Sequence, residues 1–144
     1  MPWYPYSRAA GGVLLPMIAV RLWNGDRSVR LVAVVDSGAD TSLLDATVAR
    51  RLGLDRSTAV RTVMAGADGT AFGTLRWPDT PLEFEFQGQR IPFNGAFAEF
   101  APGADTASLL GRNDFFQRFI VQFWDAAGLM NIDLSPDFPL ASLA

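Results

Sequence analysis

One short segment of the chain contains the residue types of a hydrolytic site. Residues 34–44 read VVDSGADTSLL, so Asp36 follows an apolar run and precedes a hydroxyl residue and a glycine. A carboxylate at the end of a buried strand loses hydration, which makes its charged form costly and its proton affinity tunable. Asp36 is therefore a candidate acid or base, and its use depends on a second carboxylate that faces it.

The composition excludes most other kinds of catalytic site. The chain has no His and no Cys, and because it also has no Lys, all 12 cationic side chains are Arg. The usual zinc, haem and Cys-nucleophile sites are therefore excluded, as are a Ser activated by His or Lys and a phosphate-binding P-loop. What remains is carboxylate chemistry, either acid–base hydrolysis or the binding of hard cations through oxygen, or no chemistry at all.

The size and charge of the chain predict an ordinary globular domain. With 144 residues, 49% of them hydrophobic and 19% charged, the chain is long enough to bury a sizeable core. A formal net charge of −3 gives no reason to expect nucleic acid or an anionic membrane as a partner. No apolar run approaches the ~20 residues of a membrane span. The N-terminus lacks the pattern of a signal peptide, so we expect a cytoplasmic protein.

The first strands are expected to deliver Asp36 at the end of a hairpin. Alternating apolar residues predict a strand over 17–23, and the following Asn24-Gly25 is a strong signal for a tight turn. Residues 29–35 are then the returning strand, which ends directly before Asp36. A short helix over 46–52 is expected next, because a capping Asp precedes it and a glycine follows it.

The rest of the sequence predicts further short strands. A strand over 60–64 leads into small residues and an Asp-Gly turn at 65–70, which together predict a projecting hairpin. Residues 82–86 alternate apolar with acidic side chains, as a half-buried strand does. Further expected elements are a returning strand that includes residues 91–93, a second short helix around 115–119, and a last hairpin formed by 120–124 and 129–134.

No linker and no internal repeat divides the chain. We therefore expect a single mainly β domain with two short helices, arranged as a closed or partly closed barrel. The expected core spans residues 17–134. It is flanked by an irregular N-terminal arm over 1–16 and a C-terminal tail over 135–144.

Two motifs together resemble those of the retropepsin-like aspartic proteases, the single-domain relatives of retroviral protease. The first is the apolar pair followed by Asp-Ser-Gly-Ala-Asp-Thr at residues 34–41, and the second is Leu-Leu-Gly-Arg-Asn at residues 109–113. Their order, their separation and the glycine-containing hairpin between them also match that family. The resemblance covers roughly residues 17–134 and is closest to bacterial stand-alone members.

The resemblance implies that one chain supplies half of an active site. In this family two Asp carboxylates share a proton, and one acts as a base on water while the other acts as an acid toward the substrate carbonyl. The sequence contains one Asp-Ser-Gly, so the second Asp36 must come from another copy across a two-fold axis. The implied protein is a homodimeric aspartic endopeptidase that cleaves an extended peptide and needs no metal or cofactor.

The resemblance also assigns roles to residues of the first motif. Asp36 is the implied catalytic carboxylate, and Ser37 is the hydroxyl that bonds across the dimer to lock the two catalytic loops. Gly38 lets the backbone approach the carboxylate closely. Ala39 and Asp40 are implied to contact the substrate.

Support for the site is implied to come from Gly111 and Arg112 in the second motif. Arg112 is expected to pair with Asp40 in a partly buried ion pair, because its guanidinium meets a carboxylate through two donors. The final hairpin, residues 120–134, is apolar enough to contribute to a dimer interface. The implied flap tip, which closes over the peptide, consists of Ala65, Gly66, Ala67, Asp68, Gly69 and Thr70.

Other interpretations of the same residues stay open at this point. Asp36 is the kind of residue that also serves as a turn or cap after a strand, although the second motif favours a functional position. A phosphotransfer loop is disfavoured because Asp36 and Asp40 are four positions apart and no Lys supports them. A dimeric peptide-binding or regulatory module on the same fold, with little or no turnover, is the main alternative to a protease.

Overall fold

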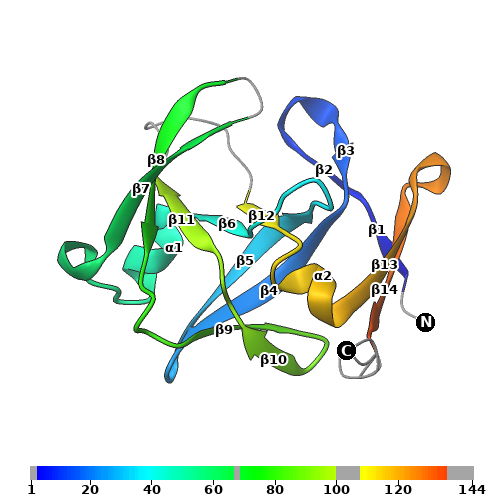
Figure 1. The fold of residues 1–144 in the computed structure, drawn as a ribbon. Helices are drawn as coiled ribbons and strands as arrows, with labels where there is room; N and C mark the ends of the chain where they lie inside the picture. The colour runs from blue at the N-terminus through cyan, green and yellow to red at the C-terminus, as the bar shows by residue number, and fades with distance from the viewer. Residues whose placement is uncertain (1–2, 67–68, 100–107, 136–144) are drawn as a thin grey trace, which may run out of the picture.

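Strands dominate the fold, and two short helices accompany them (Figure 1). The computed structural model describes residues 3–66, 69–99 and 108–135. Within these ranges the largest sheet has nine strands in the order β10-β9-β4-β5-β12-β6-β11-β8-β7, and smaller sheets are formed by β1-β14-β13 and by β2-β3. The expected mainly β class with two short helices is confirmed.

The bounds of the elements are as follows. The described strands are β1 (Trp3–Pro5), β2 (Ser7–Arg8), β3 (Leu14–Leu15), β4 (Met17–Asn24), β5 (Arg27–Val35), β6 (Leu43–Asp45), β7 (Val60–Ala65), β8 (Ala71–Arg76), β9 (Leu82–Phe86), β10 (Gln89–Pro92), β11 (Ala96–Glu99), β12 (Ser108–Leu110), β13 (Phe119–Trp124) and β14 (Leu129–Leu134). The helices are α1 (Ala46–Arg51) and α2 (Phe115–Arg118), with 3₁₀ turns at Ala10–Gly12, Arg56–Thr58 and Asp125–Ala127.

The β4–β5 hairpin is the longest paired element and forms as expected. Every second residue of β4 is buried, which places Ile18, Val20 and Leu22 in the core. The chain reverses at Gly25, whose φ of 60° is a conformation that glycine adopts without strain. Because β4 pairs with β5 from Arg27 to Val34, the end of β5 is held rigidly where the first motif begins.

Two parallel strand pairs lie at the centre of the large sheet. β12 pairs in parallel with β5, with Leu110 opposite Val35, and β11 pairs in parallel with β6. Parallel neighbours end at the same edge of a sheet. The two segments that carry the sequence motifs therefore leave the sheet side by side, one after β5 and the other after β12.

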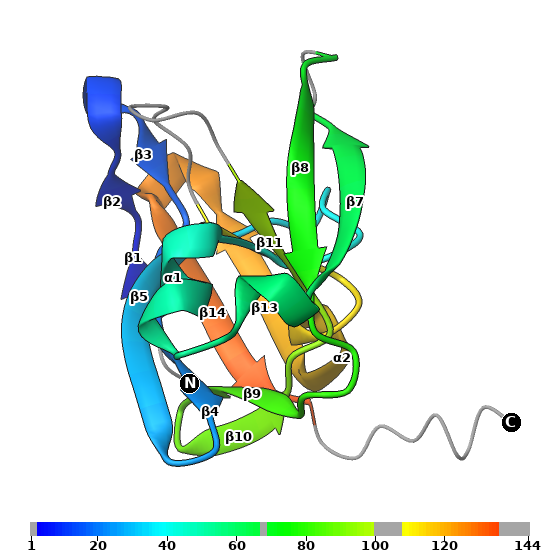
Figure 2. The ribbon, with the colours of Figure 1, turned by 90° about the vertical axis from the view of Figure 1, so that its left-hand side faces the viewer.

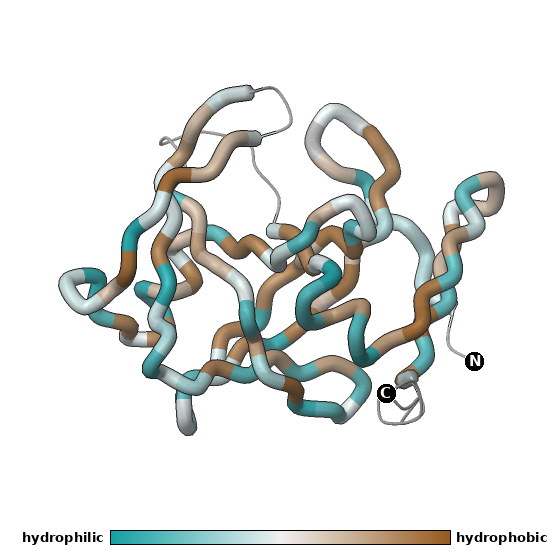
Figure 3. The backbone as a smooth tube through the Cα atoms, in the orientation of Figure 1, coloured by the Kyte–Doolittle hydropathy of each residue, from teal (hydrophilic) through white to brown (hydrophobic). Residues whose placement is uncertain are grey.

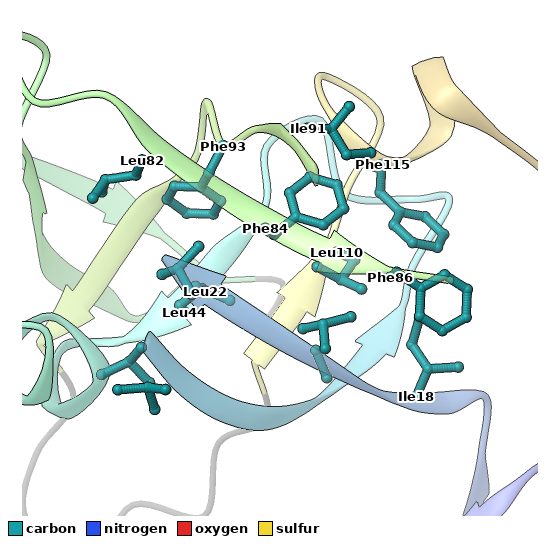
Figure 4. Packing of buried hydrophobic residues seen from close by; sticks show 14 of the residues in the cluster. Ile18, Leu22, Leu44, Leu82, Phe84, Phe86, Ile91, Phe93, Leu110 and Phe115 are labelled. Atoms are coloured by element: carbon teal, nitrogen blue, oxygen red, sulfur yellow. The ribbon is translucent and has the colours of Figure 1, made fainter. Parts of the chain in front are cut away.

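A single large apolar cluster fills the interior. Figure 4 shows Leu110 near the aromatic ring of Phe84, with Leu22 and Leu44 on one side of the cluster and Phe115 on the other. Residues 82, 84 and 86 of β9 are buried while the glutamates between them are half-buried, as their alternation predicts. Along the chain, hydrophobic and hydrophilic segments follow one another at short intervals, as expected of short strands (Figure 3). Burying each large side chain contributes about 1.5–3 kcal/mol, which stabilises the scaffold around the motifs.

The two helices form where the sequence predicts them, the first from its cap and the second from the spacing of its phenylalanines. Asp45 caps α1 by accepting a 2.8 Å hydrogen bond from the amide of Thr47, and Gly53 follows the helix with a φ of 73°. The helix lies against β11 (Figure 2). The second helix is shorter than expected, because Phe119 already begins β13 while its ring stacks on Phe115 at 4.8 Å between centroids.

The N-terminal segment is not the irregular arm expected for residues 1–16. β1 pairs with β14, placing Tyr4 opposite Met130, and β2 pairs with β3. The amide of Tyr6 also donates to the carbonyl of Gly128 at 2.7 Å. β1 gains its order from a partner far away in the sequence, and β2 and β3 are only two residues long, so the local pattern of residues did not reveal them.

The barrel is only partly closed. The nine-stranded sheet ends at β10 on one side and at β7 on the other, and the described residues show no pairing between these two strands. Pro92 lies in β10, the edge strand, where a residue without an amide hydrogen is tolerated. From residue 136 onward, the expected C-terminal tail lies outside the described residues.

Candidate active site

Asp36 lies directly after β5, where hydrogen bonds from two neighbouring segments fix the backbone. Its amide donates to the carbonyl of Leu110 at 3.0 Å, and the amide of Val35 donates to the carbonyl of Pro16 at 2.8 Å. The Asp36 side chain is half-buried, in contrast to the three residues that precede it, which are buried. The carboxylate is therefore presented at the surface from a rigid support.

A tight turn holds the Asp36 side chain in one orientation. The amide of Gly38 donates to Oδ1 of Asp36 at 2.9 Å, and the amide of Ala39 donates to the Asp36 carbonyl at 3.2 Å. A Cβ atom at position 38 would lie 3.2 Å from the same Oδ1, closer than ordinary van der Waals contact. Glycine thus suits the close approach of this backbone to the carboxylate. Ser37 and Gly38 are exposed, so a second molecule can reach this turn.

The second motif packs directly against the first. The amide of Arg112 donates to the carbonyl of Ala39, and the amide of Asn113 donates to the carbonyl of Asp40, both at 2.9 Å. Gly111 lies beneath this loop. A Cβ atom there would lie 2.7 Å from the carbonyl carbon of Thr41 and 2.8 Å from the carbonyl oxygen of Ala39. Only glycine allows the two backbones to lie this close.

The ion pair expected between Arg112 and Asp40 is present, but its environment differs from the expectation. The guanidinium of Arg112 contacts Oδ1 of Asp40. Both side chains are largely exposed, at 58% for Arg112 and 75% for Asp40, so the expectation of a partly buried pair is wrong for the single chain. Exposed ion pairs stabilise a fold by only about 0–1 kcal/mol, so this contact is a weak anchor for the loop.

The buried anchor of the second motif is Asp114, which neither sequence motif includes. It is 4% exposed, and Ser42, which donates its hydroxyl to Oδ1 of Asp114, is 0% exposed. The amide of Phe115 also donates to Oδ1 at 2.7 Å, and the amide of Asn94 donates to Oδ2 at 3.2 Å. An available signal was the Asp before Phe-Phe-Gln-Arg, since Asp is a preferred residue at the start of a helix.

Burial governs the electrostatics of Asp114. Loss of hydration raises the pKa of its carboxyl above 3.8, and the hydrogen bonds from Ser42, Phe115 and Asn94 oppose this shift only in part. The charged form is therefore costly here, although several donors point at it. Such a group is sensitive to any change in its partners.

The β7–β8 hairpin stands away from the body of the molecule, as Figures 1 and 2 show. Its end is closed by hydrogen bonds from the amide of Gly66 to the carbonyl of Thr70 and from the amide of Gly69 to the carbonyl of Gly66, each 2.9 Å. Gly69 has a φ of 83°. Ala65 lies opposite Ala71 in the pairing. Ala67 and Asp68, also expected at the flap tip, lie outside the described residues.

A surface cavity of about 480 Å³ lies away from both sequence motifs. It is lined by aromatic and proline side chains of the segments that flank β9 and β11, among them Trp77, Pro78, Pro81 and Phe93. None of the motif residues lines it. This cavity therefore gives no support to a reaction at Asp36.

The acidic residues do not form a metal centre in the described part of the chain. No group of three or more His, Cys, Asp or Glu residues there is placed to hold a metal ion. In the same residues, neither helix has the length and apolar character needed to cross a membrane.

Comparison with known proteins identifies a protein family over most of the chain. A family profile described as aspartyl protease matches residues 18–113, which contain both motifs. Among solved structures, the EIAV protease complexed with the inhibitor HBY-793 is similar, with 24% identity and a TM-score of 0.48 over 69% of this chain and 83% of that chain. A likeness of this size says nothing about activity. A search of curated proteins gave no match.

Proposed function

The chain belongs to the aspartyl protease family, and from this premise we propose that it is a homodimeric aspartic endopeptidase of the retropepsin type. The observation that carries the proposal is the match of this family over residues 18–113, which include Asp36 and most of its supporting loop. The proposed substrate is an extended peptide, held between the β7–β8 hairpins and the Asp36 pair.

The proposed reaction needs two Asp36 carboxylates that share one proton. The ionised carboxylate removes a proton from a bound water, whose oxygen then attacks the carbonyl carbon of the peptide bond. The protonated carboxyl gives its proton to the carbonyl oxygen, so a neutral tetrahedral diol forms. When the C–N bond breaks, the carboxyl that took the water proton gives it to the amine nitrogen, and the other carboxylate removes a proton from a hydroxyl of the diol, so that the pair again shares one proton. The fixed orientation of the Asp36 side chain by the Gly38 amide supports this role.

The dimer is proposed because a single chain has one half-buried Asp36 on an exposed turn. The outer face of the three-stranded sheet offers an apolar surface, since Trp3, Ile120 and Trp124 are all exposed there. Asn131 lies on the same face between Trp3 and Gln122. Its side-chain nitrogen is buried without a partner among the described residues.

The proposal is tested by replacing the catalytic carboxylate. Asp36→Asn keeps the size of the side chain and removes the ionisable group, so we expect cleavage of a peptide library to be abolished while folding and dimerisation persist. Asp26→Asn, at the exposed turn of the β4–β5 hairpin, is the matched control and should cleave normally. Cleavage that persists in Asp36→Asn would refute the assignment. A wild type that binds a peptide with a hydroxyethylene in place of the scissile bond, yet cleaves nothing, would indicate a binding module.

A further inference from the structure

Ser42 and Asp114 form a buried polar link between the two motifs. Ser42 ends the loop that begins at Asp36, and Asp114 follows the second motif. The Ser42 hydroxyl donates to Oδ1 of Asp114, while Oγ of Ser42 accepts from the amide of Gly111 at 2.8 Å. The Ser42 hydroxyl therefore connects Ser42, Gly111 and Asp114 in the buried interior of the chain.

A third segment closes around the same two residues. The amide of Asn94 donates to Oδ2 of Asp114 at 3.2 Å, and the amide of Ala96 donates to the carbonyl of Ser42 at 3.0 Å. A Cβ atom at Gly95 would lie 2.3 Å from that carbonyl, so the segment cannot move closer or carry a larger residue. Ser42 is thus fixed through its backbone and its side chain together.

The link reaches Asp36 through the backbone of the loop. Gly111, which donates to Ser42, lies against the carbonyl groups of Ala39 and Thr41, and its neighbour Arg112 donates to the Ala39 carbonyl. A shift of Ser42 would therefore be passed to the turn that orients the Asp36 carboxylate. The exposed Arg112–Asp40 pair is too weak to oppose such a shift.

We propose that Asp114, acting through Ser42, is a positioning residue that holds the Asp36 loop in its reactive geometry. This inference rests on the proposed protease function. A displacement of about 1 Å of a reacting group lowers a rate about 100-fold, whereas peptide binding along the cleft is spread over many contacts. Loss of the link should therefore act on kcat more than on KM.

The test compares variants of Ser42 with a variant of Ser57, whose hydroxyl also bonds to a carboxylate but at the surface. Ser42→Ala removes the hydroxyl, and Ser42→Thr keeps it. Ser57→Ala is the control, because the Ser57 hydroxyl also donates to a carboxylate, that of Asp55, at 2.8 Å on an exposed turn. For each variant, kcat and KM are measured on the peptide that the wild type cleaves best, and hydrogen exchange of the Gly111 amide is measured by NMR.

We expect Ser42→Ala to lower kcat about 100-fold with KM within about twofold, and to speed Gly111 exchange about tenfold. Ser42→Thr should restore both quantities to within about threefold, and Ser57→Ala should change neither. Normal kcat and normal Gly111 exchange in Ser42→Ala would overturn the proposal, as would a fall in kcat that Ser42→Thr does not restore.

A second variant keeps the test decisive if Ser42→Ala does not fold. Asp114→Asn retains an oxygen that accepts from Ser42 but places a donor against the Asn94 amide, so we expect faster Gly111 exchange and a lower kcat. Unchanged values in that variant would contradict the positioning role. If the wild type cleaves no peptide, the proposed function fails by itself, and the Gly111 exchange still decides whether the link holds the loop.

Discussion

Two carboxylates close to the second motif have opposite environments. Asp40 is exposed and contacts Arg112 at the surface, whereas Asp114 is buried among donors from three segments. A surface ion pair contributes about 0–1 kcal/mol to the stability of the fold. Leaving a buried polar group without its hydrogen-bond partner costs about 1–3 kcal/mol or more. The second motif is therefore anchored mainly by the residue that follows it and only weakly by its arginine.

The stability of the protein should depend on pH through Asp114. Because burial raises its pKa above 3.8, the folded state holds this proton more tightly than the unfolded chain does. The contribution of this group to the free energy of unfolding is then fully present below its unfolded pKa and declines as pH rises through the folded pKa. Urea unfolding from about pH 3 to about pH 6 should show the wild type losing stability relative to Asp114→Asn.

The pKa of Asp55 is shifted in the opposite direction to that of Asp114, so its effect on stability has the opposite dependence on pH. Hydrogen bonds from Ser57 lower its pKa, so its stabilising contribution is present above the unfolded pKa and is lost as pH falls. Asp55→Asn should therefore lose stability relative to the wild type on the high-pH side. If the difference between Asp114→Asn and the wild type stays constant over the same range, burial does not control the titration of Asp114.

At the scale of single residues, the sequence predicted the surroundings of a side chain where its hydrogen-bond partners are close to it in the chain. Asp36 follows an apolar run and precedes a glycine, and the structure indeed places its half-buried side chain against the Gly38 amide. The link between Ser42 and Asp114 could not be read in the same way. It joins residues 72 positions apart, and its importance comes from burial, which no local pattern encodes.

Among the elements, the decisive contact is between the loop after β5 and the turn after β12. Both leave the sheet at the same edge because their strands are parallel neighbours, and both are short enough to share backbone hydrogen bonds. This arrangement needs a residue without a side chain at position 111. The glycine of the second motif is thus required by packing between elements and not by its own backbone conformation.

Gly111→Ala should destabilise the fold. The added Cβ would lie 2.7–2.9 Å from backbone atoms of Ala39 and Thr41, which cannot turn aside as a flexible side chain can. Overpacking of this kind costs about 1–3 kcal/mol, which denaturant unfolding monitored by tryptophan fluorescence can measure. Gly73→Ala is the control, because its nearest contact is a Glu99 side-chain oxygen at 3.6 Å. Equal stability of the two variants would mean that the two motifs are not packed this closely.

Elements were predictable from the sequence where their partners are close in the chain. The β4–β5 hairpin, the β13–β14 hairpin and α1 follow from turn, cap and alternation signals. β1 and β2 could not be predicted in this way. β1 owes its order to β14 at the other end of the chain, and β2 belongs to a two-residue pairing with β3 across a glycine-containing turn.

At the scale of the whole molecule, the proposed reaction needs a second copy of the chain. A single chain supplies one Asp36 on an open turn, a projecting β7–β8 hairpin and a terminal sheet with exposed tryptophans. Trp3 and Trp124 contact each other edge to face, with centroids 6.1 Å apart, and so form one continuous aromatic surface. A two-fold dimer would bring the two turns together and cover surface of this kind.

The most direct measurement is the stoichiometry of binding for a peptide with a hydroxyethylene in place of the scissile bond. Native mass spectrometry of the wild type with this peptide should show one peptide per two chains, with no peptide on single chains. Asp36→Asn should remain dimeric and bind the peptide more weakly. A complex of one peptide with one chain, or two peptides per dimer, would contradict a site shared between two copies of Asp36.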